Sequence, residues 1–400
     1  MRSRPPRGDA QVTAVVVPRS HLNFGSAPAG GAGFLKAART PDDMELGTAT
    51  ADPGELARGY LPVTDLPTGG TEVLPVVVAN GETDGPTVWV TAGVHGDEQT
   101  GVAAAQDVMH EALPGELAGA VVCVPVLNPA GLRRTTRTSY YHDDDPNRFF
   151  PDPDRDPSRP PRVQEVVDRR VYEAFADDAD ALVDLHTATV GSVPFVIRDR
   201  VLYGERRDEA VAEELAEELA ALAEAASIPT VNEYAADEYV EQNLQRSTAG
   251  AALNNAGIPA LTLELGSPNV VEEDNRALGV RVVYDVLEEL GMVGGVPKGV
   301  PAAETPYEPP VAYPVKRHRG PNVEEPGVVR HRVEAGDVVT AGDAVASVVT
   351  PHGEHVETVE TDHDGYLLGR WRGVGAYEND AVASMAVRDD GDLVVPRDAD

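Results

Sequence analysis

Apolar residues recur in two alternating patterns between residues 70 and 290. Short runs rich in Val, Leu and Ala predict strands, and longer stretches with an apolar residue every three or four positions predict helices. The expected strands are Glu72–Val78, Thr87–Val94, Ala120–Leu127, Ala181–Leu185 and Ile258–Leu265. The expected helices are Gly101–Ala112, Val163–Ala176, 206–226, Glu241–Ala256 and Glu272–Leu290. Apolar strands that alternate with helices predict an α/β fold, in which helices cover both faces of the sheet.

The pattern changes after Gly294. The stretch 296–314 holds six prolines, which is typical of a linker. Beyond about residue 325 no helical periodicity remains, and repeated Ala-Gly-Asp turns predict a small all-β domain. These turns resemble those of the barrel-sandwich fold of biotinyl and lipoyl domains, which carry their cofactor on a lysine. Because no lysine follows Lys316, we expect a structural or lid role and not that of an acyl carrier.

The N-terminal residues differ from the rest of the chain in being basic, rich in Gly, Ala and Pro, and aperiodic. We predict an extension without order over residues 1–45, with translation starting at Met1 or at Met44. The alternative is an arm that packs on the core. A catalytic domain is then expected at 46–295, a Pro-rich linker at 296–324 and the β domain at 325–396.

The charge of the chain is strongly negative: 67 acidic against 33 basic residues give a formal net charge of −34. The acids are spread along the sequence and only three of the bases are lysines, which is typical of proteins that work in concentrated salt. We therefore expect the cytoplasm of a halophile. Nucleic acid is an unsuitable partner, since its phosphates would be repelled. No apolar run approaches the ~20 residues that span a membrane, and the single cysteine, Cys123, allows no intrachain disulfide.

Two histidines stand where predicted strands end. His95 follows the second strand, and Glu98 comes three residues later across a glycine turn. His186 ends another strand, and Asp184 lies on the same face because strand side chains alternate. Two imidazoles and one carboxylate form the His₂Glu ligand set of catalytic zinc. Asp184 is placed to hold the second nitrogen of His186. Either histidine alone is more often structural.

Glu264 lies in the middle of an apolar strand, Leu261–Leu265. Burying a carboxylate is costly unless it is paired or functional. Desolvation raises its pKa toward that of a general base. A salt-bridged core acid is the alternative.

Arginines cluster in one stretch of this acidic chain, at Arg133, Arg134 and Arg137. Fixed guanidinium groups suit a substrate carboxylate or a developing oxyanion. For Arg133 and Arg134 a solvated loop explains the charge equally well.

Five motifs follow one another in order: His95-Gly-Asp-Glu98, Asn128-Pro with Arg137 nine residues after the Asn, Asn147-Arg148-Phe, Asp184-Leu-His186 and Glu264-Leu-Gly. Together they resemble the succinylglutamate desuccinylase/aspartoacylase family, a branch of the zinc carboxypeptidase-like hydrolases, over roughly residues 70–290. The resemblance implies a mixed sheet flanked by helices and one Zn²⁺ per chain.

The resemblance also implies roles for individual residues. His95, Glu98 and His186 match the zinc ligands, and Glu264 matches the general base and acid. Arg137 matches the arginine that polarises the scissile carbonyl, while Asn147 and Arg148 match the pair that binds the substrate carboxylate. Pro146 departs from the leucine usual in that motif, and the family's further substrate-binding Arg and Tyr residues have no clear counterpart.

The expected activity is therefore hydrolysis of the amide or ester bond of a small N-acyl amino acid by a metal-activated water. The alternatives are a zinc carboxypeptidase acting on peptides and a metal-binding protein without catalysis. The presence of Glu264 and Arg137 speaks against the last, because a binding site needs neither. The oligomeric state, the acyl group and the amine are not predicted.

Overall fold

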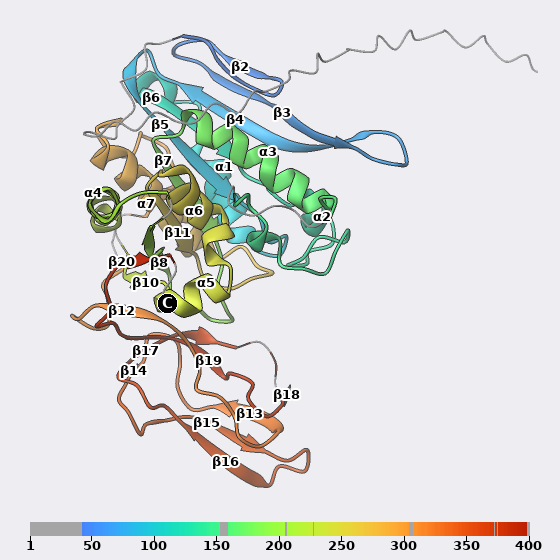
Figure 1. The fold of residues 1–400 in the computed structure, drawn as a ribbon, viewed down its shortest axis with the longest axis vertical. Helices are drawn as coiled ribbons and strands as arrows, with labels where there is room; N and C mark the ends of the chain where they lie inside the picture. Colours follow the sequence, from blue (N-terminus) through green and yellow to red (C-terminus); the bar gives the residue numbers. More distant parts are fainter. Residues whose placement is uncertain are drawn as a thin grey trace, which may run out of the picture. The chain divides into compact units, whose positions relative to one another are not determined.

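A mixed sheet of twelve strands runs through the protein (Figure 1). The computed structural model describes residues 42–152, 159–204, 206–226, 228–303, 307–371, 373 and 375–397. The strands of the sheet lie in the order β14-β17-β19-β12-β10-β8-β11-β7-β5-β6-β4-β3. Their bounds are β3 Leu56–Asp65, β4 Thr71–Asn80, β5 Thr83–Ala92, β6 Ala118–Val124, β7 Ala181–His186, β8 Phe195–Arg198, β10 Thr230–Asn232, β11 Ala260–Glu264, β12 Val315–Arg319, β14 Val338–Val339, β17 Gly365–Arg370 and β19 Ala383–Arg388.

The centre of this sheet brings three strand ends together. β5, β7 and β11 are parallel neighbours, so their carboxyl ends meet at one edge. β8 runs antiparallel to β11, with Phe195 opposite Glu264, and β10 lies parallel to β8. Ligands of open α/β sheets bind at such an edge, outside the carboxyl ends of the strands.

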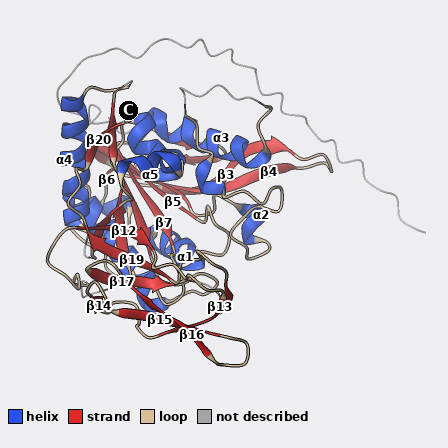
Figure 2. Ribbon diagram, turned by 60° about the horizontal axis from the view of Figure 1, so that its bottom comes forward, coloured by secondary structure: helices blue, strands red, loops and turns tan. Residues whose placement is uncertain are grey.

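Helices flank the sheet (Figure 2). The four longest are α1 Gln99–Val108, α3 Val163–Asp178, α4 Glu209–Ala225 and α7 Glu273–Glu289. α4 shows why such segments are helical: Leu215, Leu219 and Leu222 recur every three or four residues and are buried, and Asp208 caps the first turn by accepting from the Val211 N–H at 3.0 Å. α1 and α4 both pack against α7. None of the helices in the described residues has the length and hydropathy that a membrane span requires.

The C-terminal strands form a second core. β16 His355–Glu360, β15 Ala344–Val349, β13 Gly327–His331 and β18 Gly375–Ala376 make a four-stranded sheet in that order. Valines of β13 and β15 pack with Leu367 and Met385, which lie on strands of the large sheet. The expected all-β region is present, but half of it continues the large sheet. The described residues belong to one compact unit.

The fold class predicted from the sequence is confirmed: the sheet is mixed, helices flank it and additional strands follow at the C-terminus. All five predicted strands are present, with ends shifted by up to four residues. The sequence missed the ten-residue β3, the short strands β8 and β10 inside the large sheet, β1 Met44–Leu46 and β2 Ala49–Ala51, and the short β9 Val201–Tyr203 and β20 Val394–Pro396.

Three expectations need correction. The single helix over Glu241–Ala256 is wrong: Asn243 adopts a left-handed φ of 55° and Ser247 caps a new turn, so the segment breaks into short helical pieces. β12 lies inside the predicted linker 296–324. Met44 is buried in β1, although the predicted extension reached residue 45, and residues 1–41 of that extension lie outside the described residues.

Candidate metal and catalytic site

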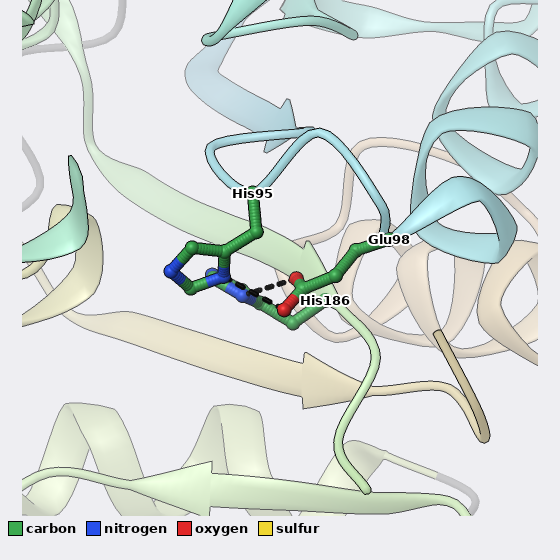
Figure 3. A group of neighbouring side chains, drawn as sticks. All are labelled: His95, Glu98 and His186. Atoms are coloured by element: carbon green, nitrogen blue, oxygen red, sulfur yellow. Dashed lines mark hydrogen bonds and ion pairs between the residues drawn. The ribbon is translucent and has the colours of Figure 1, made fainter. Parts of the chain in front are cut away.

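His95, Glu98 and His186 converge on one buried point (Figure 3). The Nδ1 of His95 lies 2.7 Å from Oε1 of Glu98, and the Nδ1 of His186 lies 2.8 Å from Oε2 of the same carboxylate. One ligand atom from each residue can be chosen so that all lie within 4.8 Å of one another. Each side chain is about 97% buried.

The local backbone explains this convergence. β5 delivers the chain to Gly93, whose φ of +64° turns it over the end of the sheet toward His95. Gly96 lies so close to the backbone of Gly131 that a Cβ atom would overlap it. Glu98 is the N-cap of α1, and its Oε2 also accepts from the Thr187 N–H at 3.3 Å.

Asp184 contacts the ring nitrogen of His186 that does not face Glu98: Oδ2 of Asp184 lies 2.7 Å from Nε2 of His186. Its other oxygen accepts from the Thr91 hydroxyl at 2.7 Å. Burial by itself would raise the pKa of Asp184, but the charge of His186 and these hydrogen bonds outweigh it, and the pKa lies below its usual range. Asp184 therefore stays ionised and fixes Nδ1 of His186 toward Glu98.

The donor set fits a divalent cation such as zinc. Burial would raise the pKa of Glu98, but both imidazoles outweigh this, so its pKa is well below the usual range. Two buried carboxylates, Glu98 and Asp184, thus need positive charge nearby. Two Nδ1 atoms and a carboxylate oxygen would hold the metal with three protein ligands, the number usual in catalytic zinc sites, where a water takes the fourth position.

Glu264 ends β11 beside His186, its direct partner in the register of the two strands. It is 9% exposed, and its Oε2 has no hydrogen-bond partner among the described residues. Burial raises the pKa of Glu264 above its usual value. An acid that the fold leaves unpaired at the edge of a cavity is a suitable general base, and the alternative of a salt-bridged core acid finds no ion pair in the described residues.

Arg137 reaches the same centre from the loop after α2 Pro129–Leu132. Its Nη1 lies 3.2 Å from Oε1 of Glu98 and its Nη2 lies 2.9 Å from Oδ2 of Asp145. Asp145 in turn contacts Nε2 of His95 at 2.9 Å. Asp145, which the sequence did not single out, therefore orients both His95 and Arg137.

Asn147 and Arg148 also line the cavity, in the short helical turn η2 Pro146–Arg148. Oδ1 of Asn147 accepts from the N–H of Thr248 at 2.8 Å, while its amide nitrogen makes no hydrogen bond with another described residue. Nη1 of Arg148 donates to the carbonyl of Asn147 at 2.6 Å. Pro146 begins this turn, a position that a proline tolerates, so the departure from leucine does not break it.

All eight predicted site residues lie at this centre, and seven of them line a cavity of about 520 Å³, the exception being Asp184 behind His186. The sequence did not predict the other charged and aromatic residues that line that cavity. The residues of this part of the lining come from strands late in the chain or follow β8, β10 and β17 directly: Asp199, Glu233, Tyr234, Arg317, Arg319, Trp371 and Ser384. The one signal for them was the run of basic residues Lys316–Arg319, which lies inside the predicted linker of an acidic chain.

Arg133 lies away from the cavity and anchors the arginine loop. Its guanidinium donates to both oxygens of Glu72, at 3.0 and 3.3 Å, and the Tyr141 hydroxyl donates to Oε2 of Glu72 at 2.7 Å. Glu72 is 2% exposed. The neighbouring Arg134 is exposed and forms no side-chain hydrogen bond or ion pair with a described residue.

This pair of adjacent arginines allows a matched test of the loop anchor. We expect Arg133→Ala to lower the free energy of unfolding by about 1–3 kcal/mol, because it leaves a buried carboxylate short of charged donors. Arg134→Ala removes the same charge and should stay within about 0.5 kcal/mol of wild type. Denaturant unfolding of both variants measures the difference, and equal effects would show that Glu72 contributes nothing through Arg133.

Comparison with known proteins agrees with this geometry. The family model of the succinylglutamate desuccinylase/aspartoacylase catalytic domain matches residues 84–290. An N-α-acetyl-L-2,4-diaminobutyric acid deacetylase of Halomonas elongata is 27% identical over 339 residues, which cover 82% of this chain and 89% of the relative.

Solved structures share the fold. The product-bound ectoine utilization protein EutE from Ruegeria pomeroyi superimposes with a TM-score of 0.66 at 21% identity, covering 86% of this chain and 99% of the other. A succinylglutamate desuccinylase/aspartoacylase from Rhodobacter sphaeroides gives 0.64 at 23% identity, covering 84% and 95%. With more than half of its length matched by the family model, the chain belongs to the succinylglutamate desuccinylase/aspartoacylase family of deacylases.

Proposed function

We propose that the protein is a zinc-dependent deacylase that hydrolyses the amide or ester bond of a small N-acyl amino acid or a related compound. The observation that carries the proposal is the placement of an unpaired buried acid, Glu264, and a guanidinium, Arg137, in the cavity where His95, Glu98 and His186 converge. Zinc bound by these three residues would lower the pKa of a water molecule and polarise the acyl carbonyl.

The residues of the chain supply the remaining steps. Glu264 takes the proton of the attacking water and passes it to the leaving amine, for which its raised pKa is suitable. Arg137 donates to the carbonyl oxygen as negative charge develops there. The free amide nitrogen of Asn147 and the guanidinium of Arg148 bind the substrate carboxylate. Asp184 and Asp145 keep the two imidazoles oriented.

The C-terminal part of the cavity lining favours a small substrate over a peptide. Arg317, Arg319, Trp371 and Ser384 line the same cavity as the candidate metal ligands, and we call them the C-terminal wall. Arg319 lies over the ring of Trp371 at 4.5 Å, which ties two strands of this wall together. A cavity of about 520 Å³ suits a small ligand. A carboxypeptidase would need room for the chain that precedes the scissile bond.

The substrates of the relatives and the charge of the chain define the conditions for a test. The Halomonas protein is named for removing acetyl from N-α-acetyl-L-2,4-diaminobutyric acid, so N-acetylated amino acids stand first among the compounds to try. The dispersed negative charge of −34 supports a halophile's cytoplasm as the working environment. Assays therefore belong in concentrated salt.

Removal of the metal is the decisive experiment. We expect about one zinc per purified chain, loss of hydrolysis after dialysis against a chelator, and recovery on adding Zn²⁺. The panel comprises N-acetyl and N-succinyl amino acids and C-terminal dipeptides. Hydrolysis that survives complete removal of metal would refute the zinc mechanism, and cleavage of peptides in preference to acyl amino acids would refute the deacylase assignment.

A further inference from the structure

Two carboxylates from neighbouring strands, Asp199 and Glu233, line the cavity. Asp199 directly follows β8 and Glu233 directly follows β10, and these strands are parallel neighbours. The N–H of Glu233 donates to the carbonyl of Arg198 at 2.9 Å, which fixes the two acids at the same level. Asp199 is 5% exposed, Glu233 is 3% exposed, and both line the cavity.

The two acids differ in their partners. Glu233 is satisfied: Oε1 accepts from the N–H of Tyr234 at 3.0 Å, and Oε2 accepts from Nη1 of Arg317 at 2.7 Å. The guanidinium of Arg317 also lies over the ring of Tyr234, at 4.9 Å. Asp199 makes no hydrogen bond or ion pair with a described residue, and its buried Oδ2 has no partner.

A buried carboxylate without a partner is costly, and a second carboxylate beside it adds repulsion. Burial first and the charge of Glu233 second raise the pKa of Asp199 well above its usual value. Arg317 is held by Glu233, and Nη1 of Arg148 donates to the carbonyl of Asn147, so neither forms an ion pair with Asp199. The fold thus leaves the buried carboxylate of Asp199 without a cationic partner among the described residues.

That cation is not expected to be a metal ion. Among the described residues, His95, Glu98 and His186 form the one group with three metal-ligating side chains in reach of one another. Asp199 and Glu233 supply only two such side chains, and Glu233 already forms an ion pair with Arg317. An ammonium group needs fewer ligands, and a single buried carboxylate binds it through a charge-assisted hydrogen bond.

We propose that Asp199, backed by Glu233, binds a protonated amine of the substrate, so that the enzyme acts on N-acylated diamino acids. This inference rests on the proposed deacylase function and names its substrate class. Arg148 lines the same cavity, in the turn that follows Asp145, and is the guanidinium to which the proposed function assigns the substrate carboxylate.

The strand register gives the amine a position. Phe195 lies opposite Glu264, and Asp199 comes four residues later, directly after the end of β8, at roughly 13 Å for an extended chain. The side chains of Glu264 and Asp199 both extend into this distance and shorten it. The amine of the substrate should therefore stand at the end of a flexible side chain, and diaminobutyrate, ornithine and lysine offer three side-chain lengths for comparison.

The test compares the N-α-acetyl derivatives of these three diamino acids with N-α-acetyl-L-norleucine, which has a neutral side chain, and with N-acetyl-L-aspartate. We expect wild type to prefer at least one diamino compound in kcat/KM. Asp199→Asn should reduce that preference over norleucine by about 10- to 100-fold, the loss of one hydrogen bond between charged groups. Glu217→Gln, which removes an exposed acid on α4, should leave the preference unchanged.

Binding of the deacylated products separates this proposal from the proposed function. Calorimetry with free diaminobutyrate, ornithine, lysine and norleucine needs no turnover, and amine binding should weaken in Asp199→Asn and in Glu233→Gln. Asp199→Asn should also not lower Tm, because it removes an uncompensated buried charge.

The outcomes are distinguishable. Amine binding that depends on Asp199, in a protein that hydrolyses none of the acetyl compounds, would support the amine site and overturn the deacylase function. Hydrolysis of norleucine or aspartate derivatives as fast as the diamino ones would overturn the amine site and leave the deacylase function standing. A preference that Asp199→Asn does not change would likewise overturn the role of Asp199.

Discussion

Glu264→Gln is expected to reduce kcat by about 10²- to 10⁴-fold, the contribution usual for a general acid–base group. The amide keeps the size of the side chain and can still reach the cavity, but it accepts no proton. Because Glu264 lies beside the ligand cluster and is not part of it, the variant should bind as much zinc as wild type. The measurements are kcat on the best acyl amino acid and metal content per chain.

The matched control for this variant is Glu289→Gln, at the exposed end of α7, which should retain wild-type kcat. A Glu264→Gln protein that keeps more than a tenth of wild-type kcat would remove Glu264 from the mechanism. Loss of activity together with loss of zinc would instead assign it to the metal site.

Asp389→Ala is expected to lower the free energy of unfolding by about 3–5 kcal/mol, since it leaves a buried guanidinium without its counterion. Nη2 of Arg200 lies 3.0 Å from Oδ2 of Asp389, and both side chains are at most 2% exposed. The same oxygen accepts from Nδ2 of Asn232 at 2.7 Å. This network joins the end of β19 to β10, next to the wall that carries Glu233.

Denaturant unfolding in concentrated salt measures this effect, and buried pairs are screened far less by salt than exposed ones. Asp390→Ala is the matched control, because Asp390 is the next residue, is exposed and forms no side-chain hydrogen bond or ion pair with a described residue. It should change the unfolding free energy by less than about 0.5 kcal/mol. Equal effects of the two substitutions would show that the buried pair contributes no net stability.

Sequence and structure agree best where local rules are sufficient. The apolar runs that became β5, β7 and β11 were visible because buried parallel strands are continuously apolar. The ligand candidates were visible because each ends a strand or follows one within a few residues: His95 and Glu98 after β5, His186 at the end of β7. Glu264 stood out as a charge within an apolar strand. Strand order, and hence the meeting of these side chains, followed from the family resemblance and not from local pattern.

Other features had no local signature. β3 was missed because it is an edge strand with mixed burial, which blurs the alternation of apolar and polar residues, although it pairs with the next strand, β4, as a hairpin. Asp145 looked like one acid among many, and only the folded loop places it between His95 and Arg137. The Glu241–Ala256 segment has helix-forming composition, yet tertiary contacts of Asn254 and Asn255 hold it as separate turns.

The sequence by itself determined the fold class, the candidate ligands and the acidic character of this protein, because periodicity, strand-end chemistry and composition are local properties. Only the tertiary structure decided which residues complete the lining of the cavity. β12 and β19 join the same sheet as β7 and β11, and so bring Arg317 and Ser384 to a site whose metal ligands lie more than a hundred residues earlier. The structure alone also shows that Asp199 has no partner among the described residues, since the hydrogen bonds and ion pairs of a buried acid depend on every chain segment packed around it.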